Sequence, residues 1–275
     1  MEPIEVEISL DRSCDNCADL LANAASLSKG RIKDAMHKGA VWLLRGGKQR
    51  RLRRVKSSLR SGDRLRMYYN QDVLELVPLQ PEMIHDARDY SIWNKPRMML
   101  SSGSRFGDHC AMSRWIEVNL KPQRPVFLIH RLDRAASGVM VFGHTKRTAA
   151  ALSEAFRLRN VGKSYGVVVK GELTDSGTIR TPLDGKESIS HYEPVRFIEA
   201  MQCTELDVAI ETGRKHQIRR HLASIGHPVL GDRLYGSDNS TELALVSKSI
   251  SFQCPTRNKR VTFSIPFEFG EMIDL

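Results

Sequence analysis

The sequence has no long hydrophobic run, and this excludes a membrane protein built from helices. No stretch of the 275 residues approaches the roughly 20 consecutive apolar residues that a spanning helix requires. The first residues, MEPIEVEISLDRS, are acidic and lack the basic and then apolar pattern of a signal peptide. We therefore expect a cytoplasmic globular protein that makes no membrane contact. A monomer is the default expectation for the architecture predicted below.

Cysteine is scarce, and its placement argues against disulfides and zinc. The five cysteines are odd in number and mostly far apart, unlike a secreted disulfide framework. Cys14 and Cys17 form a CxxC pair, but a structural zinc site needs four ligands and no second pair is present. We expect two ordinary thiols at the start of a helix.

Several catalytic signatures are also missing. No glycine-rich strand-to-helix fingerprint for phosphates or dinucleotides is present, and no Gly-x-Ser-x-Gly elbow accompanies Ser137. A metal could in principle use the following residues: His130, His216, His221, His227, Asp133 and Asp232. Their neighbouring arginines would repel a divalent cation, and no tidy ligand spacing occurs within one element. We therefore expect no catalytic metal and no site of the dinucleotide or phosphate-loop type.

Negative charge is nearly absent from one segment, residues 27–67. It holds 14 of the 42 Lys and Arg residues but only two of the 32 Asp and Glu residues. Its net charge is therefore +12, more than the +10 of the whole chain. Such a concentration is typical of a protein that binds a polyanion, and nucleic acid is favoured over a membrane because the segment lacks a large apolar face.

The same part of the chain predicts a small αβ module over residues 1–70. Residues 15–25 have helix-forming composition, and Ser28 is a suitable N-cap for a second helix that Gly39 ends. The stretches AVWLLRGGK and LRSGDRLRMYY then predict short strands with glycine turns.

This module resembles the αL-type RNA-binding module of bacterial ribosomal and RNA-modifying proteins. Ser28, residues 39–41 and Gly62-Asp63 match its helix start, its Gly-Val turn and its late Gly-Asp, whereas Leu44-Arg45-Gly46 replaces the usual Val-Asn-Gly. The residues expected to contact RNA are Lys29, Arg31, Lys33, Lys38, Arg50, Arg51, Arg53 and Arg54.

After a linker predicted at residues 71–89, residues 90–275 predict a second domain. A helix that begins near Thr145, strands at KSYGVVVKG and MQCTELDVAI, and a closing hairpin of SISFQCP with RVTFSIPF indicate an α+β fold. We expect a mixed, mainly antiparallel sheet with flanking helices.

One loop of this domain has more charged side chains than a turn between two strands needs. In LIHRLDRAASGVMVF, Asp133 lies between Arg131 and Arg134, and the apolar runs 126–129 and 139–142 predict buried strands on both sides. An isolated aspartate near arginines is either a nucleophile or an ion-paired structural carboxylate, and the loop alone leaves both readings open.

A second polar stretch is ETGRKHQIRRHLASIGHPVLGDRLYG, residues 211–236. It predicts a helix that ends at Gly226, with Ile218, Leu222 and Ile225 facing the core. His216, Arg219 and Arg220 would form a basic stripe near its N-terminus, suited to an RNA phosphate or to Asp133.

HRLDRAASGVMVF, KSYGVVVKG and TGRKHQIRRHLASIGHPVLGDRLYG together resemble the motifs of the Rlu-type pseudouridine synthases, over about residues 90 to 270. His130 and GHPVLGD favour this type over the small-subunit type, whereas Arg97-Met98 replaces the usual small residue and glycine after Lys-Pro.

The resemblance implies an isomerase that converts uridine to pseudouridine without metal or cofactor. It makes Asp133 the catalytic aspartate, Tyr165 the active-site tyrosine and Arg219 the partner of Asp133. The residues expected to contact substrate are His130, Arg131, Arg134, Lys163, Arg214, His216 and Ile218. Ribosomal RNA, above all that of the large subunit, is the expected substrate. Transfer RNA is the alternative, and the rival functions are a non-catalytic RNA-binding factor and a metal-dependent nuclease.

Overall fold

The structure is a computed structural model that describes residues 2–236, 241–257 and 259–267. Within it the chain forms two compact units. The N-terminal unit comprises Met1–Leu79 and Ser102–Leu120, and the second unit comprises Gln80–Ser101 and Lys121–Leu275. The segment Ser102–Leu120 thus groups with the N-terminal unit although it lies inside the range predicted for the second domain. The domain limits at 70 and 90 stay a prediction.

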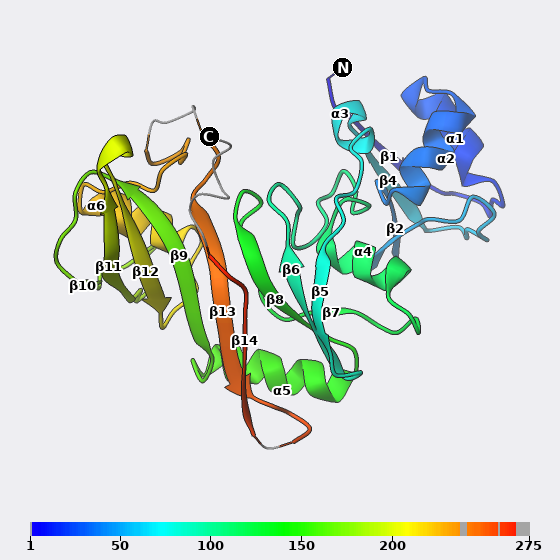
Figure 1. Ribbon diagram of the computed structural model, residues 1–275. Helices are drawn as coiled ribbons and strands as arrows, with labels where there is room; N and C mark the ends of the chain where they lie inside the picture. The colour runs from blue at the N-terminus through cyan, green and yellow to red at the C-terminus, as the bar shows by residue number, and fades with distance from the viewer. Residues whose placement is uncertain (1, 237–240, 258, 268–275) are drawn as a thin grey trace. The chain divides into compact units, whose positions relative to one another are not determined.

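Four strands form the sheet of the N-terminal unit, in the order β1-β4-β2-β3 (Figure 1). They are β1 (Ile4–Ser9), β2 (Val41–Arg45), β3 (Lys48–Arg51) and β4 (Arg64–Tyr69). All three pairings are antiparallel. The sequence predicts β2 and β4 but not β3, which is basic and polar, nor β1. In β1 apolar residues alternate with acidic ones, and only a half-buried face packs on the core.

The helices of this unit are α1 (Cys17–Ala25), α2 (Lys29–His37), α3 (Gln71–Leu74) and α4 (Met112–Asn119). The first two are predicted from the sequence, and α2 begins where expected because the Ser28 hydroxyl accepts the Arg31 N–H at 3.3 Å. Leu21 of α1 and Ile32 and Met36 of α2 are fully buried. These two helices therefore cover the core of the unit.

Asp108 joins the segment Ser102–Leu120 to the sheet of the same unit. Its carboxylate forms an ion pair of 3.1 Å with Arg51 and a second ion pair with Arg53. Arg51 also donates to the carbonyl of Ser104 at 2.7 Å and lies 4.1 Å from the centre of the Trp42 ring. Two arginines predicted to contact RNA are thus engaged in holding this unit together.

The second unit is built on one large sheet with the strand order β10-β11-β12-β9-β13-β8-β6-β5 (Figure 1). In addition, β7 pairs with β8 and β14 pairs with β13. The strands are β5 (Glu82–Asp86), β6 (Tyr90–Lys95), β7 (Phe127–Leu128), β8 (Ser137–Gly143), β9 (Gly162–Lys170), β10 (Gly177–Ile179), β11 (Ser190–Ile198), β12 (Cys203–Ile210), β13 (Leu245–Gln253) and β14 (Arg260–Ser264).

The pairing pattern confirms the predicted fold class. Among the described residues, β8 and β13 form the single parallel pair of strands, and the other ladders are antiparallel. The predicted closing hairpin is present as β13 and β14. Because β5 pairs with β6, the second half of the predicted linker belongs to this sheet.

Among its described residues the second unit also contains two α-helices and one turn of 3₁₀ helix, η1 (Glu199–Met201). The helix α5 (Lys146–Arg157) begins as predicted, because the Thr145 hydroxyl accepts the Thr148 N–H at 3.1 Å. The helix α6 (Gln217–Ser224) buries Ile218 and Leu222 as predicted. The prediction for Ile225 is wrong, since it follows the end of α6 and is 37% exposed.

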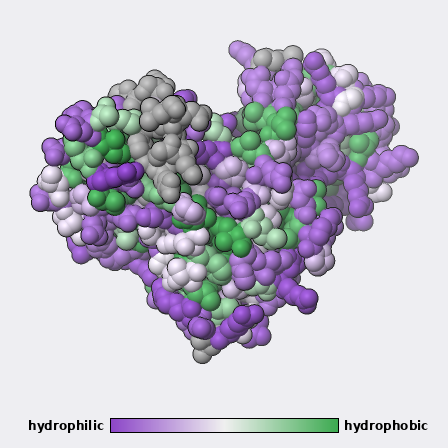
Figure 2. All heavy atoms as spheres, in the orientation of Figure 1, coloured by the Kyte–Doolittle hydropathy of each residue, from purple (hydrophilic) through white to green (hydrophobic). Residues whose placement is uncertain are grey.

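The visible face of the N-terminal unit is mostly hydrophilic in Figure 2. Leu76, Val77 and Leu79, by contrast, are apolar side chains of this unit that remain exposed. Within the described part of the chain, no helix combines the length and the hydropathy needed to cross a membrane.

Candidate active site

Asp133 lies in the loop between β7 and β8, and neighbouring groups fix this loop. The Ser101 hydroxyl accepts the Leu132 N–H at 3.0 Å and lies 2.8 Å from the Leu132 carbonyl oxygen. The fully buried ammonium of Lys95 donates to the carbonyls of Met99, at 2.8 Å, and Arg134, at 3.3 Å. Burial lowers the pKa of Lys95 to about 7, against the opposing effect of the Asp133 charge. Leu132, before Asp133, is therefore held by Ser101, and Arg134, after Asp133, is held by Lys95 of β6.

Arg219 of α6 approaches Asp133 but is anchored elsewhere. Its Nε and Nη2 atoms each donate to a different oxygen of Asp232, both at 2.7 Å. Its Nη1 donates to Oδ2 of Asp133 at 3.3 Å. The side chain of Arg219 is 7% exposed. The guanidinium thus binds Asp232 in a bidentate manner and offers its remaining edge to Asp133.

Asp232 is the residue that sequence reasoning missed. It is completely buried and accepts the backbone N–H groups of Leu234 and Tyr235, at 2.9 and 3.1 Å, besides the guanidinium. Burial alone would raise its pKa, but the hydrogen bonds from Arg219 and the two amides hold the pKa below the ordinary value. Its sequence signal is the aspartate after glycine in GDRLYG, which the sequence alone suggests only as a possible metal ligand.

The same contacts keep Arg219 charged. Burial disfavours the guanidinium ion, yet the hydrogen bonds to Asp232 and the charges of Asp232 and Asp133 raise the pKa of Arg219 above its ordinary value. The site therefore contains two carboxylates and one permanently charged arginine between them.

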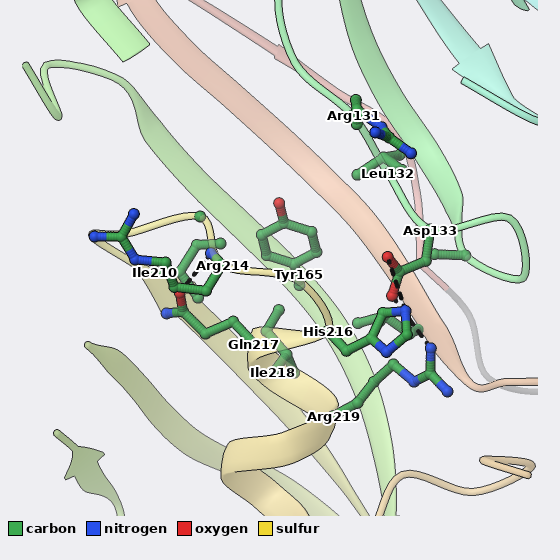
Figure 3. A pocket seen from close by; sticks show the side chains of 13 residues that line it. Arg131, Leu132, Asp133, Tyr165, Ile210, Arg214, His216, Gln217, Ile218 and Arg219 are labelled. Carbon is green, nitrogen blue, oxygen red and sulfur yellow. Dashed lines mark hydrogen bonds and ion pairs between the residues drawn. The ribbon is translucent and has the colours of Figure 1, made fainter. Parts of the chain in front are cut away.

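Tyr165 lies on β9 and is 8% exposed. Burial raises its pKa, the charge of Asp133 adds to this effect, and a hydrogen bond with Ser247 opposes it. The phenol is therefore protonated throughout the neutral range. Tyr165 and Asp133 border one small pocket, as Figure 3 shows.

This pocket has a volume of about 100 Å³ and combines apolar walls with basic side chains. It is lined by Arg131, Leu132, Asp133, Ala136, Tyr165, Ile210, Gly213, Arg214, His216, Gln217, Ile218, Arg219 and Leu245. The three predicted catalytic residues therefore line one pocket, together with four of the seven residues predicted to contact substrate.

His216 precedes α6 and faces the carboxylate of Asp133. Its Nε2 atom lies 3.8 Å from Oδ1 of Asp133, and its Nδ1 atom is hydrogen-bonded at 3.0 Å to the Tyr235 hydroxyl. Figure 3 shows the side chains of Asp133, His216 and Arg219 directed toward one another. Burial lowers the pKa of His216, against the opposing charge of Asp133.

The predicted basic stripe on α6 is wrong. His216 has a left-handed backbone with φ of 53° and lies before the helix, whereas Arg219 is buried in the site. Arg220 forms hydrogen bonds of 3.1 and 3.2 Å with Asp184, which lies on the surface. His216 and Arg219 nevertheless both face Asp133, one of the two anions that the sequence suggests, and only Arg220 has a separate partner.

Three residues predicted to contact substrate do not line the pocket. His130 stacks on Phe156 with 4.7 Å between ring centres, and its Nε2 atom accepts the Val141 N–H at 3.1 Å. Lys163 lies 3.4 Å from the Thr212 carbonyl oxygen, and burial lowers its pKa to about 8. Arg134 is exposed and points its Nε toward the Met98 carbonyl at 3.4 Å. Their contact with substrate stays a prediction.

The predicted RNA-contact residues of the N-terminal unit fall into two groups. Lys29 pairs with Asp19, Lys38 pairs with Asp34, and Arg51 and Arg53 share Asp108. The others are exposed with no described side-chain partner: Arg31, Lys33, Arg50 and Arg54.

Comparison with known proteins shows which enzymes share this mainly antiparallel sheet. The profile of the family described as RNA pseudouridylate synthase matches residues 89–224. An uncharacterized RNA pseudouridine synthase of Aquifex aeolicus is 30% identical over 276 residues, which cover 86% of this chain and 85% of that protein. The chain belongs to the RNA pseudouridine synthase family, which confirms the predicted family and enzyme class.

Two further likenesses extend the comparison. The ribosomal large subunit pseudouridine synthase D of Salmonella typhimurium is 30% identical over 178 residues, which cover 58% of this chain and about half, 53%, of that protein. The structure of human RNA pseudouridylate synthase domain containing 1 has a TM-score of 0.61 at 20% identity, covering 72% of this chain and 89% of that chain. The second likeness concerns the fold alone.

Proposed function

We propose that this synthase isomerises uridine to pseudouridine in ribosomal RNA of the large subunit, with Asp133 as its nucleophile. The observation that carries the proposal is the position of the Asp133 carboxylate. It borders a small pocket, is 27% exposed, and is held by Arg219 on one oxygen. A structural ion pair alone does not require an open pocket beside the acid, whereas a nucleophile does.

The reaction exchanges one bond of the nucleoside for another. The C1′–N1 glycosidic bond breaks while Asp133 forms a covalent link to the substrate, and the released uracil turns within the pocket. A new bond joins C1′ to C5, the hydrogen on C5 leaves as a proton, N1 gains a proton and the carboxylate is restored. Since a base inside a helix cannot reach a pocket of this kind, we expect the uridine to be flipped out.

The other residues have supporting roles in this proposal. Tyr165 offers a ring on which the uracil can stack, and its protonated phenol can donate a hydrogen bond. Arg219 orients Asp133, and Ile218 supplies an apolar wall. Arg131 and Arg214 lie at the pocket and are suited to RNA phosphates.

Ribosomal RNA is proposed because the Salmonella relative is named as a large-subunit synthase, and transfer RNA remains the alternative substrate. We also propose that residues 1–70 bind RNA, supported by the +12 charge of residues 27–67. We further propose that the protein is a monomer located in the cytoplasm.

The test uses RNA with tritium at C5 of uridine, because the proposed reaction releases that hydrogen to water. Large-subunit RNA, small-subunit RNA and transfer RNA are incubated separately with the full chain. We expect the wild type to release tritium stoichiometrically from large-subunit RNA without added metal. The Asp133→Asn variant should release no tritium.

The matched control is Asp184→Asn, which replaces a carboxylate at the surface, where Asp184 pairs with Arg220. It should release tritium at the wild-type rate. Release by Asp133→Asn, or none by the wild type on any of the three RNAs, would overturn the proposed function. Release of tritium from transfer RNA alone would support the proposed reaction but overturn the proposed ribosomal RNA substrate.

A further inference from the structure

Tyr235 lies behind His216 in a chain of contacts that ends at Asp133. The hydroxyl of Tyr235 is 3.0 Å from Nδ1 of His216, and Nε2 on the other side of the ring faces Oδ1 of Asp133 at 3.8 Å. The dashed lines in Figure 3 mark the contacts of His216 and Arg219 with the two oxygens of Asp133. Each oxygen of the carboxylate therefore has its own facing group.

Buried groups place both members of the Tyr235–His216 pair. The carboxylate of Asp232, which has no exposed surface, accepts the backbone N–H of Tyr235. Gln217, 3% exposed, accepts the backbone N–H of Arg214 at 3.0 Å and the Thr212 hydroxyl at 2.8 Å. These contacts hold the short turn before α6 in which His216 adopts its positive φ of 53°. The backbone that carries the His216 ring and the backbone that carries Tyr235 are therefore both held in place.

The neutral form of His216 carries one N–H, so its tautomer decides what Asp133 meets. A carboxylate only accepts hydrogen bonds, and a nitrogen lone pair directed at it is repelled. If Nδ1 accepts the proton of the Tyr235 hydroxyl, the single N–H is on Nε2 and points to Asp133. The opposite tautomer would direct the lone pair of Nε2 at Oδ1.

Burial, more than the balance of nearby charges, favours the neutral form of His216 by lowering its pKa. Arg219 and Lys215 disfavour a histidine cation, whereas Asp133 and Asp232 favour it, and burial of the ring is the largest influence and lowers its pKa. At 3.8 Å the contact with Asp133 is an electrostatic one rather than a hydrogen bond.

We propose that Tyr235 is a positioning residue that fixes the Nε2–H tautomer of His216, so that His216 and Arg219 orient the two oxygens of Asp133 from opposite ends. The inference rests on the proposed role of Asp133 as the nucleophile. It assigns to Tyr235 an effect on the reaction although Tyr235 does not line the pocket.

The first test measures the tautomer without RNA. In the full chain labelled with ¹⁵N, the chemical shifts of the two ring nitrogens identify which one carries the proton. We expect Nε2–H in the wild type and a mixture of both tautomers in Tyr235→Phe, which removes only the hydroxyl. A wild type with the proton on Nδ1 would overturn the proposal.

The second test measures turnover. Tyr235→Phe should lower kcat about tenfold and leave KM unchanged, because the loss of one orienting hydrogen bond is worth about 1.4 kcal/mol, which corresponds to a factor of ten in rate. Tyr192→Phe removes the hydroxyl of a half-buried tyrosine on β11 and serves as the matched control with wild-type kcat. An unchanged kcat in Tyr235→Phe would contradict the proposal.

A double-mutant cycle separates positioning from a general effect on structure. In His216→Gln the side-chain amide can still offer an N–H near Asp133 but has no tautomer to fix. Tyr235→Phe should therefore cost little further kcat in that background, and an undiminished tenfold loss would overturn the proposal. Absence of turnover in the wild type would instead overturn the proposed function, and the tautomer measurement is independent of that outcome.

Discussion

Arg219 donates two hydrogen bonds of 2.7 Å to Asp232 and one of 3.3 Å to Asp133. The arginine expected to serve the candidate nucleophile is therefore bound more closely to a second, fully buried acid. This division of contacts leaves Asp133 oriented but not enclosed in a tight ion pair. A nucleophile must leave its resting contacts when it forms a bond, and a single long hydrogen bond costs little to give up.

Asp232→Asn should destabilise the second unit because it removes the charge opposite a buried arginine. We expect a loss of about 3 kcal/mol in the free energy of unfolding, measured by urea denaturation. Asp184→Asn, the control at the surface partner of Arg220, should change it by less than about 1 kcal/mol. Equal stabilities of the two variants would show that the Arg219–Asp232 pair contributes little.

His130 should make the protein less stable in mild acid. Burial, aided by the charge of Lys163, lowers the pKa of His130 to about 3, whereas an unfolded histidine takes up its proton near pH 6.5. The unfolded chain therefore binds more protons between these values, and stability from this group falls as the pH drops from about 6.5, by up to about 1.4 kcal/mol per pH unit.

The check compares the wild type with His130→Gln, whose side-chain oxygen can still accept the Val141 N–H. The advantage of the wild type in free energy of unfolding should shrink between pH 7 and pH 5. For Thr262→Ala, a change at an exposed residue of β14 whose side chain does not titrate, the difference from the wild type should stay constant. A constant difference for His130→Gln as well would refute the assignment of a buried neutral ring.

The exposed arginines of the N-terminal unit should account for much of the salt dependence of RNA binding. Arg50 and Arg54 have no described side-chain partner, so replacing both by alanine should weaken affinity and reduce the slope of log Kd against log salt by about 1.5. Lys146→Ala with Arg147→Ala, at exposed positions of α5, should leave the slope unchanged. The same slope for both double variants would contradict RNA binding by this unit.

Local signals in the sequence were sufficient for much of the fold. The sequence predicted Ser28 as the cap of α2 and a helix start near Thr145, and both residues prove to be caps, which depend only on residues three positions away. The apolar alternation of RLRMYY likewise predicted β4. The strand β1 was missed because its alternating acidic residues give an exposed face that resembles a polar terminus.

The site was predictable only where the motif itself carries the chemistry. Asp133, Tyr165 and Arg219 do line one pocket, but the sequence could not show that Arg219 gives its two shortest bonds to Asp232. A guanidinium chooses between two acids by tertiary geometry, which spacing along the chain does not contain. For the same reason Asp108, 55 positions beyond Arg53, gave no sign of its pairing.

The return of Ser102–Leu120 to the N-terminal unit means that the chain passes between the two units three times. A domain attached by one linker can be cut off, exchanged or duplicated as a cassette, but this unit cannot. Deleting residues 1–70 would leave Asp108 without its partners Arg51 and Arg53, in a segment that has lost the sheet it packs on. Variants of single residues, rather than truncations, are therefore the way to separate RNA binding from catalysis in this protein.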